Sequence, residues 1–367
     1  MSNKVKILIT FLLIFANFFA YSQLNAPKYS NEFLAVGIGG DALAMSNSVI
    51  ASSGNVSSAY WNPAGLTRIQ NDMQLGAMHS EYFAGIAKFD YLGGSYRLSD
   101  STVFAVSMIR FGVDNIPNTL ELIDNDGNIR YDRIKSFSVA DYAFLFSYAG
   151  ISKIEGLRYG ANVKIIRRKA GDFANAWGFG LDAAAQYDYK KFRFGAMFRD
   201  VTSTFNAWSF NTAELEETFI LTGNEIPKNS LEITMPKLIL GAAYTYDIND
   251  KFGLLTEIDG DISFDGKRNT IIKSNIASID PHWGAEINYR KIVFLRMGIG
   301  NFQKISDFDN KTSMTFQPNI GLGLKIRRIE IDYALTDIGD QSIALYSNIF
   351  SLRYSINKIE KSKTMIE

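Results

Sequence analysis

The sequence predicts an all-β protein: a 14-stranded antiparallel transmembrane β-barrel of the outer-membrane type, preceded by an N-terminal plug or hatch segment. Three observations predict it. An apolar leader is followed by no second run that could span a bilayer as a helix. Apolar and polar residues alternate with a period of two along most of the chain. The connections between the alternating runs are mostly short at one end and long at the other.

Residues 1–22 are typical of a secretory signal peptide. Lys4 and Lys6 provide the basic region, an apolar stretch follows, and Ala20 and Ser22 suit cleavage directly after Ser22. An uncleaved membrane anchor is the alternative. The sequence contains no cysteine, which argues against a lipid-anchored lipoprotein and against a disulfide framework.

The composition of the mature chain suits a β-protein. The leader carries two lysines and no acidic residue, so its removal leaves 36 basic and 38 acidic residues. The mature chain therefore lacks the net positive charge that favours binding to nucleic acid. The sequence has 27 Phe, 18 Tyr and 29 Gly, and aromatic residues favour strands. No linker-like stretch divides the chain. We expect a plug in 23–71, a barrel in 72–357 and a periplasmic C-terminal tail in 358–367.

Residues 282–289, HWGAEINY, illustrate the alternation. Trp283, Ala285, Ile287 and Tyr289 would share one face of a strand, and the residues between them are polar or glycine. In a membrane barrel the apolar face meets lipid and the other face lines the lumen. The same pattern predicts fourteen strands, near 73–81, 84–98, 102–112, 136–149, 156–168, 173–188, 191–200, 237–247, 251–262, 281–290, 291–301, 314–326, 328–336 and 345–356.

The lengths of the connections predict the orientation. Connections after even-numbered strands are mostly short, whereas those after odd-numbered strands are often long: 113–135, 201–236, 263–280 and 302–313. A soluble sandwich gives no reason for this sorting, but outer-membrane barrels have short periplasmic turns and long outer loops. An even strand number returns the chain to its starting side. We therefore expect an outer-membrane location with both termini periplasmic.

A barrel of fourteen strands encloses a lumen that wall side chains alone do not fill. The segment SSAYWNPAGLTRIQ, residues 57–70, is rigid, bent and aromatic. Proline pushes the preceding Asn62 into an extended conformation, Pro63 fixes its own φ, and Gly65 permits a turn. We expect a fixed plug element inside the barrel, formed by Tyr60, Trp61, Asn62, Pro63, Ala64 and Gly65.

Residues suited to catalysis are scarce. His79 and His282 are the two histidines, both in expected strands, and no cysteine is present. We expect no enzymatic activity, metal or cofactor. The basic run KIIRRK, residues 164–169, lies at the outer end of an expected strand. It predicts either contact with lipopolysaccharide or an acidic partner, or a solvated strand extension.

Three aromatic residues, Phe205, Trp208 and Phe210, lie in 201–236, the longest expected outer loop. Large aromatics are unusual in a loop unless they fold inward or bind something. Two interpretations therefore stay open. The residues bind a partner, or they pack over the barrel mouth.

The element SSAYWNPAGL resembles the N-terminal hatch of FadL-type outer-membrane barrels, which carries an Asn-Pro-Ala motif. The chain resembles more specifically the PorV/PorQ family of the type IX secretion system of Bacteroidetes, and a PorV-like member more than PorQ. The resembling stretches, in order, are NEFLAVGIGGDALAMSNSVIASSGNVSSAYWNPAGL, MPKLILGAAYTYD, HWGAEINYRKIVFLRMGIGN and PNIGLGLKIRRIEIDYALTDIG. The resemblance implies a non-enzymatic barrel that serves protein secretion. Its implied partners are translocon or attachment-complex subunits and the C-terminal domains of secreted cargo.

Two functions compete at this point. The first is the protein-binding barrel of type IX secretion, and the alternative is a FadL-like importer of hydrophobic small molecules. A simple diffusion porin is disfavoured by the expected plug. An importer needs an apolar path and a gap in the wall, which a proline or a bulge in a strand would mark. We interpret the expected strands as free of internal proline, which leans toward the first function.

Overall fold

The computed structural model describes residues 30–124, 126–212, 216, 219–220, 223, 225–226, 228–306, 312–336, 338 and 346–357. The expected signal peptide, 1–22, and the expected tail, 358–367, lie outside the described residues. Within the described ranges, no helix has the length and apolar character needed to cross a membrane.

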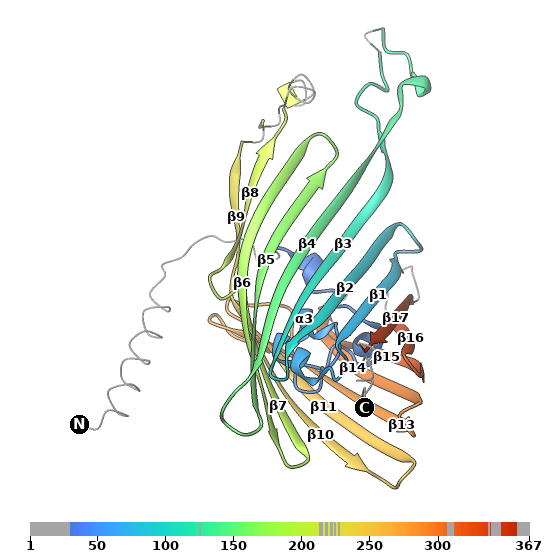
Figure 1. Ribbon diagram of the computed structural model, residues 1–367. Coiled ribbons are helices and arrows are strands. Elements are labelled where there is room, and N and C mark those ends of the chain that lie inside the picture. Colours follow the sequence, from blue (N-terminus) through green and yellow to red (C-terminus); the bar gives the residue numbers. More distant parts are fainter. Residues whose placement is uncertain are drawn as a thin grey trace, which may run out of the picture.

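Fourteen strands of the described chain form a closed antiparallel barrel (Figure 1). The barrel closes because β1 pairs with both β2 and β17. In ring order the strands are β1(Met73–Tyr82), β2(Ala87–Ser99), β3(Thr102–Asn118), β4(Lys135–Ile151), β5(Leu157–Ala170), β6(Ala174–Tyr189), β7(Phe192–Arg199), β10(Lys237–Asp247), β11(Phe252–Ser263), β13(Ser278–Tyr289), β14(Val293–Ser306), β15(Thr312–Ile326), β16(Ile329–Thr336) and β17(Ser347–Ile356). The fold class and the fourteen expected strands are confirmed.

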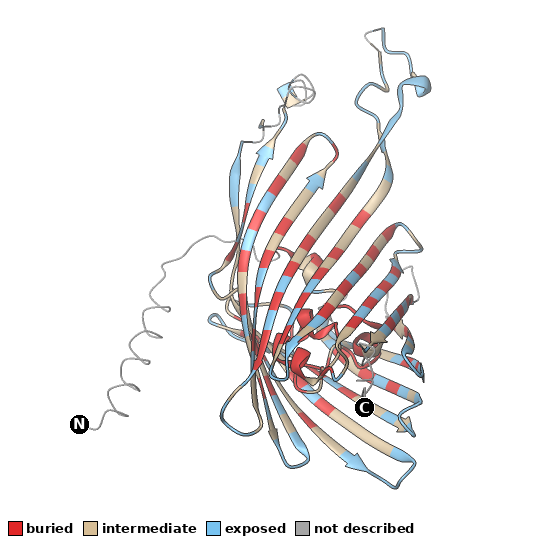
Figure 2. Ribbon diagram, in the orientation of Figure 1, coloured by how far each residue is buried: buried red, intermediate tan, exposed pale blue. Residues whose placement is uncertain are grey.

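The two faces of the wall differ, as the alternation predicts (Figure 2). Leu322 of β15 is 56% exposed and points out of the barrel, whereas the neighbouring Gly321 lies against Ala44 inside it. Trp283 and Ile287 of β13 are likewise exposed. A continuous apolar outer face is what a barrel needs in order to contact lipid.

One side of the barrel rises above the rest (Figure 1). There β6 pairs with β7 through residues 183–189 and with β8(Thr204–Phe210) through residues 174–179. Between β7 and β8 the chain turns at 200–203, where Asp200 and Ser203 have positive φ. β9(Ser230–Thr234) pairs with β8. The expected loop 201–236 therefore contains a two-stranded ribbon, the β8–β9 ribbon, that extends the wall. A further short strand, β12(Ile272–Lys273), pairs with β13.

The interpretation that the strands are free of proline is wrong. Pro117, Pro281 and Pro318 lie in β3, β13 and β15. Proline cannot donate to the ladder and is tolerated in strands at edges and irregularities. Close to Pro318, the β14–β15 pairing shifts between Gly300 and Gln303, which forms a bulge.

The basic run 164–169 is divided by its strand. Lys164 is buried on the inner face and pairs with Asp182 at 2.8 Å. Arg167 lies on the other face, 4.8 Å from the ring of the exposed Trp177. Because successive side chains of a strand point to opposite faces, these cations do not form a single cluster.

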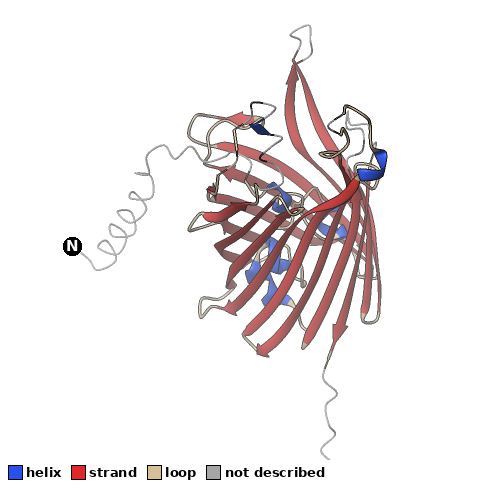
Figure 3. Ribbon diagram, turned by 90° about the horizontal axis from the view of Figure 1, so that it is seen from above, coloured by secondary structure: helices blue, strands red, loops and turns tan. Residues whose placement is uncertain are grey.

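The stretch 30–71, just before β1, lies inside the barrel (Figure 3). Its short helices are η1(Glu32–Leu34), α2(Gly40–Ala44), α3(Ser58–Trp61) and η2(Pro63–Arg68); η3(Tyr131–Arg133) lies in the β3–β4 connection. Asn62 is extended, with φ −156° and ψ 99°, as expected before proline. Its side chain caps η2 by accepting from the amide of Ala64. We call residues 30–71 of this segment the plug.

The lengths of the connections generate a test of orientation. We expect a peptide tag inserted after Gly127, in the long β3–β4 connection, to bind antibody on intact cells. A tag between Lys190 and Lys191, in the short β6–β7 turn, should bind only after the outer membrane is permeabilised, because short turns face the periplasm. Flow cytometry measures both. Equal labelling of the two tags on intact cells would contradict the orientation.

Candidate functional site

The Asn-Pro-Ala element lies at the centre of the plug. Asn62 is fully buried, and its side-chain amide donates to the carbonyl oxygens of Ile50, at 2.9 Å, and of Ala185 in β6, at 3.1 Å. Ala64 and Pro63 lie directly against Gly160 of β5. Asn62 therefore joins two plug turns to the wall, which explains why an amide side chain suits this position.

The aromatic pair before Asn62 is held by polar contacts. The Tyr60 hydroxyl donates to the carbonyl of Leu34, and Trp61 Nε1 donates to that of Ile38 at 2.9 Å. The two rings meet edge to face, with centroids 4.7 Å apart. Arg199 of β7 lies 4.3 Å from the Tyr60 ring and donates to the Tyr60 carbonyl at 3.1 Å.

The wall touches the plug backbone directly at several glycines. A Cβ built on Gly298 of β14 would lie 2.5 Å from the amide nitrogen of Ser46, and one on Gly160 equally close to that of Ala64. Such distances cannot be tolerated without displacement of the plug backbone. The same close approach to plug atoms occurs at other wall glycines, which include Gly76, Gly195, Gly284 and Gly321.

Two buried carboxylates of β11 accept plug amides. Glu257 accepts from the amides of Ala51, at 2.6 Å, and Ser52, at 3.2 Å, while Asp259 accepts from Ile50 at 3.0 Å. Three consecutive plug amides are thus satisfied by one strand. Buried backbone amides need such partners, so these hydrogen bonds hold this turn of the plug against the wall.

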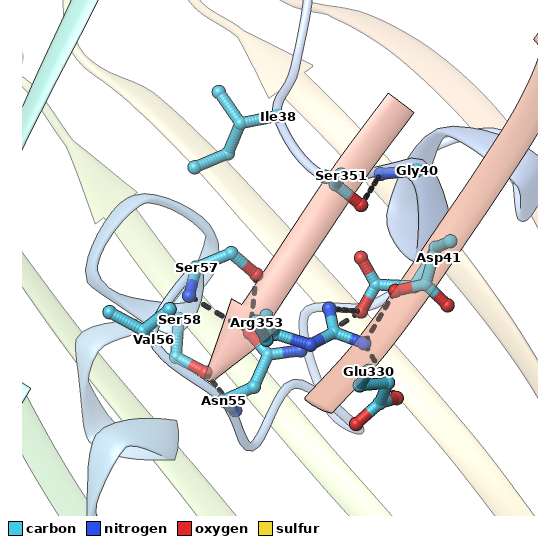
Figure 4. Close-up of polar contacts among 12 residues, drawn as sticks. Ile38, Gly40, Asp41, Asn55, Val56, Ser57, Ser58, Glu330, Ser351 and Arg353 are labelled. Atoms are coloured by element: carbon cyan, nitrogen blue, oxygen red, sulfur yellow. Dashed lines mark hydrogen bonds and ion pairs between the residues drawn. The ribbon is translucent and has the colours of Figure 1, made fainter. Parts of the chain in front are cut away.

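On the opposite side, an ion-pair network joins the plug to the last strands (Figure 4). Arg353 of β17 donates to Asp41 of α2 at 2.6 Å, and to Glu330 and Asp332 of β16 at 2.7 Å each. Burial alone would raise the pKa of Asp41, but the charges of Arg353 and Arg296 outweigh it and hold that pKa below its usual range. Asp41 is therefore a carboxylate at neutral pH.

The plug divides the lumen into two chambers. An outer chamber of about 560 Å³ is lined by plug residues such as Leu43 and by the β1–β2 turn at Phe83. An inner chamber of about 860 Å³ is lined by plug residues such as Met45 and by Lys291 at the short β13–β14 turn. Trp61 lines both chambers. A smaller cavity of about 70 Å³ lies beside the 200–203 turn.

The plug also covers an apolar part of the inner wall. Phe89 of β2, Ile109 of β3, Leu145 of β4 and Ile166 of β5 are at most 2% exposed and belong to one cluster. Phe33, Leu34, Val36 and Ile38 of the plug pack in or against it. We call the four wall residues the apolar wall patch. Apolar side chains on the inner face are unusual, because barrel lumens are otherwise polar.

The three expected loop aromatics lie in β8. Asn206 of this strand donates to Asn31 of the plug at 3.0 Å, so its face points into the barrel, and alternation places Trp208 and Phe210 on the same face. Trp208 donates to Glu232 of β9 at 2.6 Å. Phe205 is on the other face and is 42% exposed. The structure thus separates Phe205 from the other two.

The histidines lie apart from each other. His79 is on the outer face beside Asp90, at 2.7 Å, whereas His282 lines the outer chamber between Asp261 and Ser48. In the ranges that the structure describes, no three His, Cys, Asp or Glu side chains are grouped so as to hold a metal ion.

The comparisons with known proteins support the fold. No protein-family model matches the sequence, and no curated protein matches it. Among solved structures the chain is similar to the CymD monoaromatic hydrocarbon channel, with 13% identity and a TM-score of 0.54, over 88% of this chain and 98% of that one. It is also similar to the toluene transporters TbuX of Ralstonia pickettii and TodX of P. putida, each with 12% identity, over 88% of this chain and 99% of theirs, with TM-scores of 0.52 and 0.53. At this identity the likeness shows the fold.

These neighbours share the barrel fold of this chain, so the fold that the resemblance implied is supported. The finer assignment to PorV and type IX secretion finds no match among them. The neighbours named here are a channel and transporters.

The close contact at Gly298 generates a prediction. We expect Gly298→Ala to unseat the plug, because the new methyl group meets backbone rather than a flexible side chain. Overpacking of this kind costs about 1–3 kcal/mol. The readouts are the melting temperature of the refolded protein and ion leakage in planar bilayers. The matched control is Gly260→Ala in β11, where a Cβ would make only an ordinary contact with Ile279. Equal effects of the two changes would contradict the prediction.

Proposed function

We propose that this protein is an outer-membrane transport barrel that imports hydrophobic small molecules. The observation that carries the proposal is the apolar wall patch inside the lumen. Burying apolar surface is favourable by about 25 cal/mol per Å², so a lumen with such a surface attracts apolar solutes where a polar porin lumen does not. Phe33 and Ile38 of the plug belong to the same buried cluster as the patch.

The neighbours add support of a limited kind. CymD, TbuX and TodX are described as a hydrocarbon channel and toluene transporters, and this chain has their fold. The wall also has the irregularities that an importer with a lateral exit requires, at the 200–203 turn and at the bulge between Gly300 and Gln303. A location in the outer membrane, with both termini periplasmic, is part of this proposal, as is contact with outer-membrane lipid and lipopolysaccharide.

Uptake of labelled toluene by cells that carry the protein in their outer membrane tests the proposal. We expect Leu145→Asn to lower the uptake rate about tenfold, because a polar group in the patch would cost a bound apolar solute roughly 1.4 kcal/mol. The control is Leu145→Met, which keeps the volume and the apolar character of the side chain. Heat-modifiable gel mobility confirms that both variants fold. No uptake above the level of cells without the protein would contradict the proposal.

A second candidate is a protein-binding barrel in type IX secretion. The sequence resemblance favours it, and so does the β8–β9 ribbon. In the described part of the chain β9 pairs with β8 alone, and an unpaired strand edge can accept a strand from a partner. The partners would be translocon or attachment-complex subunits and the C-terminal domains of secreted cargo, bound near Phe205, Trp208 and Phe210.

The double variant Trp208→Ala and Phe210→Ala distinguishes the two candidates. Aromatic hot spots contribute about 2 kcal/mol or more each, so a protein-binding barrel should lose about a thousandfold in affinity. Affinity purification from native outer membranes in mild detergent would then lose the partners. If the double variant folds and retains every partner, the surface near Trp208 and Phe210 is not the binding site for these partners. Toluene uptake that depends on Leu145 supports the importer instead.

A further inference from the structure

The partition between the two chambers is one side chain thick at Trp61. Neighbouring residues of the plug alternate between the chambers: Leu43 and Ser46 line the outer one, whereas Ala42 and Met45 line the inner one. Among the residues that the structure describes, Trp61 is the one that lines both. Trp61 therefore lies between the two spaces.

The ring is fixed in this position. Trp61 is 4% exposed and is anchored by its bond to the Ile38 carbonyl and by its edge-to-face contact with Tyr60. A Cβ on Gly37, which has φ +93°, would lie 3.0 Å from Trp61 Cη2, so the chain passes close to the ring. The surrounding plug backbone is hydrogen-bonded to the barrel wall. Neighbouring atoms would thus fill only part of the space left by loss of the ring.

The two chambers differ in charge. Three arginine and lysine side chains and three carboxylates line the outer chamber, apart from His282. Eight arginine and lysine side chains line the inner chamber against four carboxylates. Asp188 and Asp332 do not line the inner chamber but pair with arginines that do. Including them brings the carboxylates to six against eight cations, which leaves a surplus of two positive charges.

Part of this surplus is local. Arg68, Arg158 and Arg193 surround the single carboxylate of Asp188, with the Arg193 contact at 4.0 Å. Lys291 adds a positive charge at the short turns. A concave space lined by charge of one sign concentrates ions of the opposite sign. The inner chamber should therefore hold anions.

We propose that the two chambers form an anion-selective path through the barrel, closed by the Trp61 side chain. The ligand class of the inner chamber is then a small anion, such as chloride, phosphate or a carboxylate. The proposal does not rest on hydrophobic import, because ion flow in a bilayer tests it without any apolar substrate.

Trp61→Ala in the full-length protein tests the partition. In planar bilayers with potassium chloride, we expect discrete conductance steps where the unchanged protein is closed. The matched control is Leu43→Ala, since Leu43 is 5% exposed and lines the outer chamber but not the inner one. That variant should stay closed. A folded Trp61→Ala protein that is as tight as the unchanged one would overturn the proposal.

The reversal potential in a salt gradient tests the selectivity. Trp61→Ala should pass chloride several-fold better than potassium, and added Arg193→Gln and Lys291→Gln should remove most of that preference. Arg167→Gln is the control, because Arg167 packs on Trp177 at the outside of the barrel and should change nothing. Cation selectivity of the Trp61→Ala protein would overturn the proposal.

A third variant tests the proposal without relying on the space that Trp61→Ala leaves in the partition. The chain contains no cysteine, so Trp61→Cys provides a single thiol at the partition. A negatively charged methanethiosulfonate reagent added from the inner side should modify it several-fold faster than a positively charged one. Equal rates, or no modification from either side, would contradict the proposal.

Discussion

An irregular segment inside a barrel must find hydrogen-bond partners for its backbone, and the rest of the structure depends on this requirement. Buried amide and carbonyl groups that lose water without a replacement are costly. The wall supplies replacements at fixed points: carboxylates for the amides of 50–52, and the amide side chain of Gln186 for the Ile50 carbonyl. The plug is consequently not a loose occupant of the lumen but an internal part of the barrel.

The two sides of the plug are held by different chemistry. Toward β2–β5 it covers an apolar surface that includes Phe89 and Leu145. Toward β14–β17 it meets buried charges, with Arg296 and Arg353 sharing Asp332. Buried ion pairs contribute little net stability but are strongly destabilising when one partner is lost, so they specify one seated position. The apolar contact carries no such penalty. We therefore expect the plug to yield first on its apolar side.

Much of the fold could be predicted from the sequence because strands have a strict period of two. The conformation of Asn62 also followed from the proline after it. β8 was missed for a physical reason: Phe205 faces outward while Trp208 and Phe210 face inward, so the strand has no single apolar face. Pro318 was visible inside an expected strand and should have indicated the nearby bulge.

The site was harder to predict than the barrel. Its contacts join residues that are far apart in the chain, such as Asp41 and Arg353, and no local pattern indicates such pairs. The wall glycines were a usable signal, since glycine at inward positions of strands indicates close approach of another backbone. Gly284, Gly298 and Gly321 all meet this description.

The link between Asp41 and Arg353 has a consequence for biogenesis. Arg353 and Ser351 belong to β17, the strand that pairs with β1 to close the barrel, and both bind α2 of the plug. A nascent barrel that closed around an empty lumen would leave the Arg353 charge without its plug partner at the seam. Closure of the last strand is thus coupled to enclosure of the plug, so a barrel that closes with all its partners closes around a filled lumen.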